Sequence, residues 1–270
     1  MDVKHMLNQL DQLYNNGQFK QAETLIDNCI IQAMETHNYG AALTFYNELE
    51  GLYRTTGRAP EAADVSDKAL QLIDTMGLNG TVHHATTLLN GATANRWANN
   101  IDKALEMYLQ AAEIYHRLGE KNSYLVASLY NNISHIYQQK NQHHTALEHL
   151  ETALDIVSNT SDSAGEIATT QVTMTLSYMA LENMEKAHEL LECALGYYQS
   201  EQGLNDGHYG SCLSAYGEYL WRTKEYDKAI DIYEKALQIT HSRFGENEGC
   251  RVIKHNLEII RKEKSENQII

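Results

Sequence analysis

Several residue types are scarce in this chain of 270 residues, and each scarcity excludes a class of structure. Proline occurs once, at Pro60, which suits long helices because a proline inside a helix costs roughly 3 kcal/mol. No stretch approaches the roughly 20 consecutive apolar residues that a membrane-spanning helix needs. The N-terminal segment also lacks the apolar run of a signal peptide, so we expect a cytoplasmic protein without a membrane partner.

Positive charge and cysteine are scarce as well. Lysine and arginine total 21 against 36 acidic residues, which gives a formal net charge of −15. Nucleic acid and acidic membrane surfaces are therefore excluded as partners, because both bind through Lys and Arg, whereas a basic protein partner is permitted. The four cysteines contain no CxxC pair, and we expect free thiols.

The sequence motifs of common active sites are also missing. The chain contains neither GxGxxG nor GxxxxGK[ST], and it has no GxSxG or HExxH. Thirteen histidines are present, but the adjacent pairs at His83 and His143 point about 100° apart on a helix and do not share an ion easily. We therefore expect no enzyme activity, no cofactor and no metal.

What the chain does contain is a repeat of small residues. One series recurs at intervals of 40, 42, 42, 41 and 42 residues, and it consists of Ala22, Ala62, Ala104, Ala146, Ala187 and Ala229. We call these six residues the anchor alanines. A second small residue follows each anchor by seven positions, at Cys29, Ala69, Ala111, Ala153, Ala194 and Ala236. A fixed period of this size predicts an all-α array of stacked units.

Each unit has the pattern of a helical hairpin. In the fourth unit, an apolar stripe through Leu129, Ile133 and Ile136 is followed by KNQH and by a second stripe through Leu147 and Leu150. Six such units are expected within one domain over 1–270, at about 3–35, 39–76, 81–118, 123–158, 164–200 and 206–242. The last segment has one apolar stripe and is interpreted as a capping helix over 247–264, which repeat arrays need.

These features resemble the tetratricopeptide-repeat family. The resemblance is carried by the small–large–small spacing of Ala104, Tyr108 and Ala111 and by an aromatic residue in the first helix, such as Tyr137. The period near 42 residues is similar to the long repeats of kinesin light chains, although the terminal proline of the family motif is missing from every unit. The resemblance implies a right-handed superhelical solenoid whose first helices line a concave surface.

Counting back from the anchors locates the predicted inner face. Residues 18, 14 and 11 positions before an anchor share one face of the first helix, and most of them are short and uncharged. An asparagine bonds a peptide backbone without reading its side chains, because it carries both a donor and an acceptor. The binding residues predicted on and beside this row are Thr86, Asn90, Ser128, Asn131, Asn132, His135 and Thr173.

The third unit departs from the pattern of the others. Asn95 stands where the other units have Tyr or Leu, and Arg96 and Trp97 follow it. Arg and Trp are enriched at binding hot spots, so the sequence adds Arg96 and Trp97 to the candidate site. The alternative interpretation is a shifted helix in which Trp97 fills a gap.

The sequence favours a non-enzymatic module whose groove binds a peptide or a segment of a partner protein. One alternative is a scaffold or self-assembling protein that uses its convex face or its open end. Another is a peptide-sensing regulator, because bacterial receptors for signalling peptides use similar repeats. The ligand and the oligomeric state are not specified by these patterns.

Overall fold

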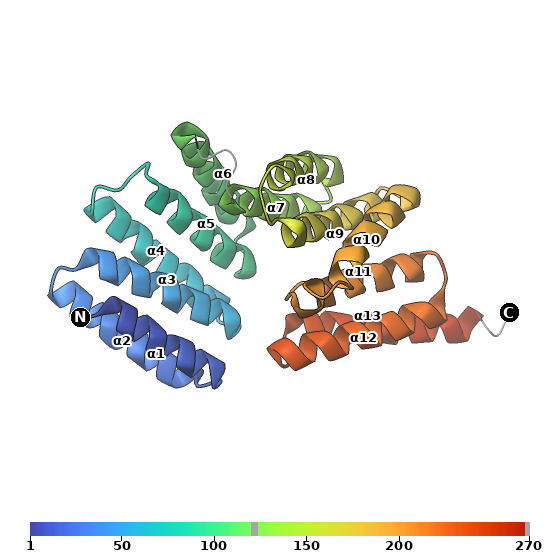
Figure 1. The fold of residues 1–270 in the computed structure, drawn as a ribbon, viewed down its shortest axis with the longest axis horizontal. Coiled ribbons are helices and arrows are strands. Elements are labelled where there is room, and N and C mark those ends of the chain that lie inside the picture. The colour runs from blue at the N-terminus through green and yellow to red at the C-terminus, as the bar shows by residue number, and fades with distance from the viewer. Residues whose placement is uncertain (120–123, 268–270) are drawn as a thin grey trace. The chain divides into compact units, whose positions relative to one another are not determined.

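The computed structural model describes residues 1–119 and 124–267. Regular structure in that part of the chain is entirely helical, with 13 α-helices and one short 3-10 helix (Figure 1). Contacts divide the chain into an N-terminal unit, residues 1–121, and a C-terminal unit, residues 122–270. We describe each unit by itself, and the expectation of one domain over the whole chain stays a prediction.

The N-terminal unit is built from three helical hairpins. Its helices are α1 (Val3–Asn15), α2 (Phe19–Glu35), α3 (Tyr39–Thr55), α4 (Ala59–Thr75), α5 (Val82–Trp97) and α6 (Ile101–Leu118). Each helix packs on the next one along the chain, and α3 also contacts α5. The first helices of the second and third hairpins therefore lie side by side.

The C-terminal unit continues the same plan with three hairpins and a last single helix. Its helices are α7 (Tyr124–Gln139), α8 (His143–Ser158), α9 (Ala164–Ala180), α10 (Met184–Tyr198), the 3-10 helix η1 (Gly203–Asn205), α11 (Tyr209–Arg222), α12 (Tyr226–Phe244) and α13 (Glu248–Asn267). Here α9 contacts both α7 and α11, and α13 packs on α12 (Figure 1). The predicted all-α array of helical hairpins is confirmed.

The anchor alanines lie where the helices approach each other most closely. All six are fully buried, and the second small residue of each unit is at most 3% exposed. Helix axes at the close end of the 8–10 Å range require small side chains at the contact. The same two-residue seam is therefore present in every hairpin, as the spacing predicts.

A shared turn joins the two helices of each hairpin. The residue five positions before the anchor has a positive φ in all six, and the set is Gly17, Gly57, Asn99, Asn141, Glu182 and Lys224. The next amide then donates back across the turn, as in the bond from Glu225 N to Leu220 O at 2.8 Å. This left-handed helix ending satisfies carbonyls that the helix leaves unpaired. Four of the six turns hold it without a glycine.

Replacing Lys224 by glycine should stabilise the chain by about 0.5–1 kcal/mol, because glycine adopts the left-handed conformation without a Cβ penalty. The opposite change, Gly57→Ala, should destabilise by about 1 kcal/mol for the same reason. Urea denaturation followed by circular dichroism measures both. A lower unfolding free energy for Lys224→Gly would contradict the role assigned to this turn.

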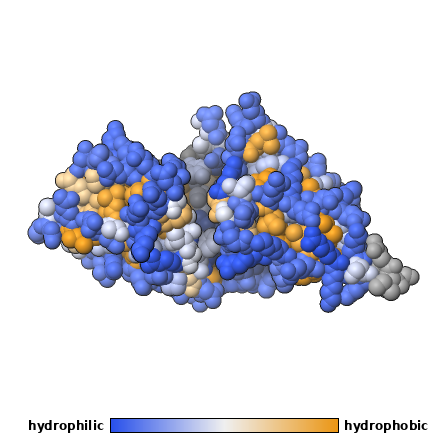
Figure 2. All heavy atoms as spheres, turned by 90° about the horizontal axis from the view of Figure 1, so that it is seen from below, coloured by the Kyte–Doolittle hydropathy of each residue, from blue (hydrophilic) through white to orange (hydrophobic). Residues whose placement is uncertain are grey.

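The surface agrees with the composition of the chain. Hydrophilic residues cover most of the face seen in Figure 2, and hydrophobic residues gather there in separate patches. Within the described residues no helix combines the length and the apolar character needed to cross a bilayer. Among the cysteines, Cys29, Cys212 and Cys250 are buried free thiols, and Cys193 is exposed.

One carboxyl group is buried in the N-terminal unit. Glu50 of α3 is 1% exposed, and neither of its carboxylate oxygens has a hydrogen-bond partner among the described residues. Arg54 Nε lies 3.7 Å from Oε1, which is an ion pair of poor geometry. Burial raises the pKa of Glu50 to about 7, and the charge of Arg54 opposes this only in part.

This buried carboxyl predicts a pH dependence of stability. Folded Glu50 holds its proton more tightly than an unfolded glutamate does. Its contribution to the free energy of unfolding is therefore present below pH 4.5 and is lost as the pH rises to about 7. The loss amounts to about 3 kcal/mol at most. Between pH 5 and 8, the free energy of unfolding measured by urea denaturation should decrease less for Glu50→Gln than for the wild type. Parallel curves for the two proteins would rule out this assignment.

Candidate functional site

Two adjoining cavities lie on the inner helices of the C-terminal unit, and together we call them the inner groove. The first has a volume of about 340 Å³, and it is lined by Tyr124, Ala127, Ser128, Asn131, Val157, Gly165, Glu166, Thr169, Asp206, Gly207 and His208. These residues come from α7, the end of α8, α9 and the segment that leads into α11. The cavity therefore crosses three consecutive hairpins.

The second cavity has a volume of about 410 Å³ and is more apolar. Its lining includes apolar side chains of α9, α11 and α13, namely Val172, Leu176, Ala215, Val252 and Ile253. Polar groups at its edge are His135, Thr173, Ser211, Ser214, Glu218 and Asn256. Thr169 and His208 line both cavities, so the two cavities adjoin each other.

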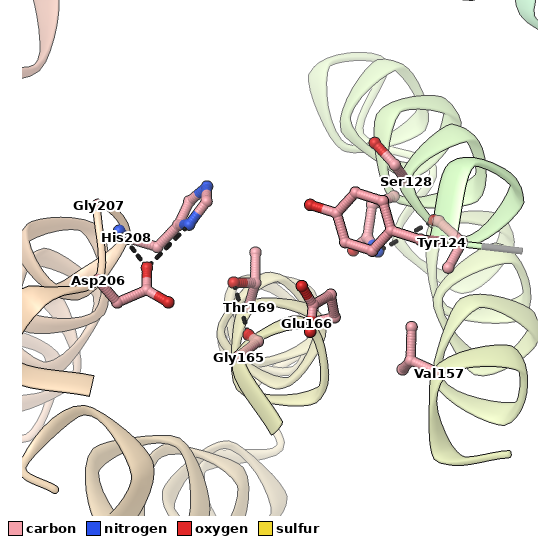
Figure 3. A pocket seen from close by; sticks show the side chains of 11 residues that line it. Tyr124, Ser128, Val157, Gly165, Glu166, Thr169, Asp206, Gly207 and His208 are labelled. Carbon is pink, nitrogen blue, oxygen red and sulfur yellow. Dashed lines mark hydrogen bonds and ion pairs between the residues drawn. The ribbon is translucent and has the colours of Figure 1, made fainter. Parts of the chain in front are cut away.

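Side chains from three segments meet at the first cavity (Figure 3). Tyr124 projects from the start of α7, Glu166 from the first turn of α9, and His208 from the residue before α11. Asp206 holds the last segment in place, because its Oδ1 accepts the backbone amide of His208 at 2.8 Å. Its Oδ2 accepts the hydroxyl of Tyr197 at 3.2 Å.

Glu166 and Asp206, the two carboxylates of this cavity, both raise the pKa values of Tyr124 and Tyr197. Burial raises the pKa of Tyr124, and the charges of Glu166 and Asp206 raise it further. Burial also raises the pKa of Tyr197, with the same two carboxylates adding to the shift. Both carboxylates therefore act on the phenols at the first cavity. Among the residues that the structure describes, no Lys or Arg lines this cavity.

Four of the predicted binding residues line the inner groove. Ser128 and Asn131 border the first cavity, and His135 and Thr173 border the second. Asn131 differs from the prediction in one respect, because its amide faces the protein. Its Nδ2 donates to Ala127 O at 3.1 Å and to Thr170 Oγ1 at 3.0 Å, and its Oδ1 is buried without a partner among the described residues.

The other predicted residues lie outside both cavities. Asn132 is partly buried, and no hydrogen bond to its side chain occurs within the described part of the chain. Asn90 is also partly buried, on α5 of the N-terminal unit. The Thr86 hydroxyl lies 3.0 Å from that of Tyr115, so this threonine joins the two helices of its own hairpin.

The irregular third hairpin has a structural explanation at Asn95. This residue is fully buried, donates from Nδ2 to Gly91 O at 2.9 Å, and accepts from Asn100 Nδ2 at 3.1 Å. The polar side chain on the seam is thus satisfied. Arg96 lies beside Trp97, with its guanidinium carbon 5.6 Å from the ring centroid, and Trp97 is 56% exposed. Trp97 is therefore at the surface and does not fill a core gap, whereas Arg96 is partly buried.

Counting from the anchors missed the acidic end of the groove. Glu166 lies three residues before Thr169, so one more helical turn on the same row reaches it. Asp206 and His208 lie in the connection before α11, which a count along helices does not cover. Within the described residues no group of three His, Cys, Asp or Glu side chains has the arrangement of a metal site.

Comparison with known proteins agrees with this architecture. A model of the tetratricopeptide repeat matches residues 83–159 and 166–240, which is more than half of the chain. The chain belongs to the tetratricopeptide-repeat family. This confirms the family predicted from the spacing of the anchor alanines. No curated protein sequence matches the chain.

Several solved tetratricopeptide-repeat-like structures are similar in fold. BtubC from P. vanneervenii aligns with a TM-score of 0.67 and 18% identity, over 85% of this chain and 93% of that one. A putative kinesin light chain from Podosopora anserina gives 0.61 and 19%, over 73% and 96%. NprR in complex with its cognate peptide NprX gives 0.65 and 15%, over 96% and 78%. At these identities the likeness shows a shared fold.

Adjacent asparagines provide a matched test of the inner face. Asn131→Ala should lower the unfolding free energy by about 1 kcal/mol, because it removes two hydrogen bonds between and within helices. Asn132→Ala should change it by less than about 0.5 kcal/mol, as surface substitutions usually do. Urea denaturation measures both variants, and equal values for the two would contradict the inward orientation of Asn131.

Proposed function

We propose that this chain is a non-enzymatic module that binds an extended peptide, or an extended segment of a partner protein, in the inner groove. The observation that carries the proposal is the pair of adjoining cavities across α7, α9, α11 and α13. Binding pockets for ligands are typically concave and apolar, with a few polar groups that fix orientation. The inner groove has this composition.

The polar groups of the groove suit a peptide backbone. Ser211 is exposed in the second cavity, and its hydroxyl has no hydrogen bond within the described residues. Asn256 donates from Nδ2 to the Tyr233 hydroxyl at 3.3 Å, which leaves its Oδ1 to accept from a ligand. Ser128 adds a hydroxyl at the first cavity, and Asn131 lines the same space with its amide bonded to Thr170 of α9. These side chains are the proposed backbone contacts.

The structural relatives support the same class of function. NprR, a protein of similar fold, was solved with its cognate peptide. We extend peptide binding to this chain as part of the proposal. Asn132, His135 and Thr173 are retained as proposed contacts near the groove. Thr86, Asn90, Arg96 and Trp97 are retained as proposed contacts of the N-terminal unit.

A library of random 12-residue peptides displayed on phage tests the proposal. Peptides selected on the full chain are synthesised, and their affinity is measured by fluorescence anisotropy. Ser211→Trp places a large ring in the second cavity, so it should weaken binding at least about tenfold, the loss of one strong contact. Ser242 is exposed and lines neither cavity, so Ser242→Trp serves as the matched control.

The far-ultraviolet spectrum and the melting temperature of both tryptophan variants establish that they fold. Two results would overturn the proposal. One is a failure of the library to yield any peptide that binds the wild type. The other is full retention of affinity by Ser211→Trp for every selected peptide.

A further inference from the structure

We infer that the peptide held by the inner groove carries a lysine or arginine side chain in the first cavity and an apolar side chain in the second. This inference rests on the proposed function and names the chemistry of its ligand. It follows from the distribution of charge and of apolar surface along the groove, which differs between its two ends.

The charges that line the groove are mainly negative. Three carboxylates are present, Glu166, Asp206 and Glu218, and no Lys or Arg among the described residues lines either cavity. Glu218 is already paired, because Arg222 Nη2 donates to its Oε1 at 2.8 Å. Within the described part of the chain, the groove carboxylates that no Lys or Arg pairs with are the two of the first cavity. That end of the groove is therefore the one that attracts a cation.

The two carboxylates of the first cavity differ in their contacts. Asp206 is engaged by the Tyr197 hydroxyl and by the backbone amide and ring Nδ1 of His208. The carboxylate of Glu166 makes no hydrogen bond or ion pair within residues 1–119 and 124–267, and it is partly buried. A partly buried carboxylate that faces a cavity without a partner is an acceptor for a charge-assisted hydrogen bond.

The residues around these carboxylates pack closely. Gly165 allows the Tyr197 and Asp206 side chains to pack on the start of α9, because a Cβ there would lie 2.9 Å from Tyr197 Oη and 3.1 Å from Asp206 Oδ2. The phenol of Tyr124 projects toward the same space from α7 (Figure 3). The carboxylates and the phenol together offer acceptors of the kind that an ammonium or guanidinium group requires.

The second cavity forms the apolar end of the groove. Val252 of α13 lines the second cavity and is nevertheless 49% exposed, although Leu176, Ala215 and Ile253 surround the same space. An apolar side chain placed there removes this surface from water at about 25 cal/mol per Å². Because the cavities share Thr169 and His208, the cationic and apolar side chains belong within about three residues of each other in an extended peptide.

The test uses the peptides selected from the random 12-residue library, synthesised with acetylated N-termini and amidated C-termini. Acetylation removes the terminal amine, so retained binding assigns the cation to a side chain. In the tightest peptide, replacing its Lys or Arg by Gln should weaken binding to the wild type about fivefold. Against Glu166→Gln, the same peptide change should cost less than about twofold.

Glu185→Gln is the matched protein control, because it removes the same unit charge from an exposed position on α10. It should leave the fivefold cost of the peptide change intact. A charge swap completes the test: the Glu166→Lys protein should prefer the peptide whose cationic residue is replaced by Glu. Such a preference is not expected from a nonspecific effect of net charge.

The outcomes distinguish this inference from the proposed function. Selected peptides that lack a basic residue but are blocked by Ser211→Trp would overturn the inference and leave peptide binding in place. Loss of binding on acetylation, or equal costs of the peptide change against wild type and Glu166→Gln, would also overturn it. A library without any peptide blocked by Ser211→Trp would overturn the proposed function itself.

Discussion

The close contact between the two helices of each hairpin is the constraint on which the other features depend. Each contact is made by an anchor alanine and by the small residue seven positions later, all of them buried. Because the second helix is held so close, the first helix is fixed in rotation about its own axis. Its inward face then repeats in the same orientation from hairpin to hairpin. The side-by-side packing of α7, α9 and α11 turns this repetition into a continuous groove.

The two units differ in how their buried polar side chains are satisfied. In the N-terminal unit, polar side chains enter the packed layers themselves, as Glu50, Ser66 and Asn95 do. Asn95 is satisfied by hydrogen bonds, whereas Glu50 is not. In the C-terminal unit the buried hydroxyls of Thr170, Thr175 and Ser177 are bonded within or between helices. Ser128, Thr169 and Thr173 of the same unit line the two cavities, and the candidate site therefore lies in the C-terminal unit.

Spacing alone was sufficient to predict the helices, their pairing and the buried seam, because these depend on small residues at a fixed period. It also located Ser128, Asn131, His135 and Thr173, which line the groove. The spacing did not predict that the Asn131 amide turns toward Thr170. These two residues are 39 positions apart in sequence, so their hydrogen bond depends on how the helices pack. Likewise, the residue types at Glu182 and Lys224 do not predict a left-handed turn, because glycine or asparagine usually occupies that conformation. Asp206 and His208 reach the groove through a connection whose path depends on η1.

The buried Glu50 has a consequence for how the N-terminal unit loses its structure. In a repeat array, stability is nearly a sum of contributions from each repeat and from the interfaces with its immediate neighbours. Ionisation of Glu50 therefore destabilises the second hairpin and its interfaces with the hairpins that touch it. A rise in pH from about 4.5 to about 7 then favours partly ordered states in which this hairpin opens while the seams of distant hairpins persist. The balance between opening of one hairpin and unfolding of the whole unit thus depends on proton concentration through Glu50 of α3.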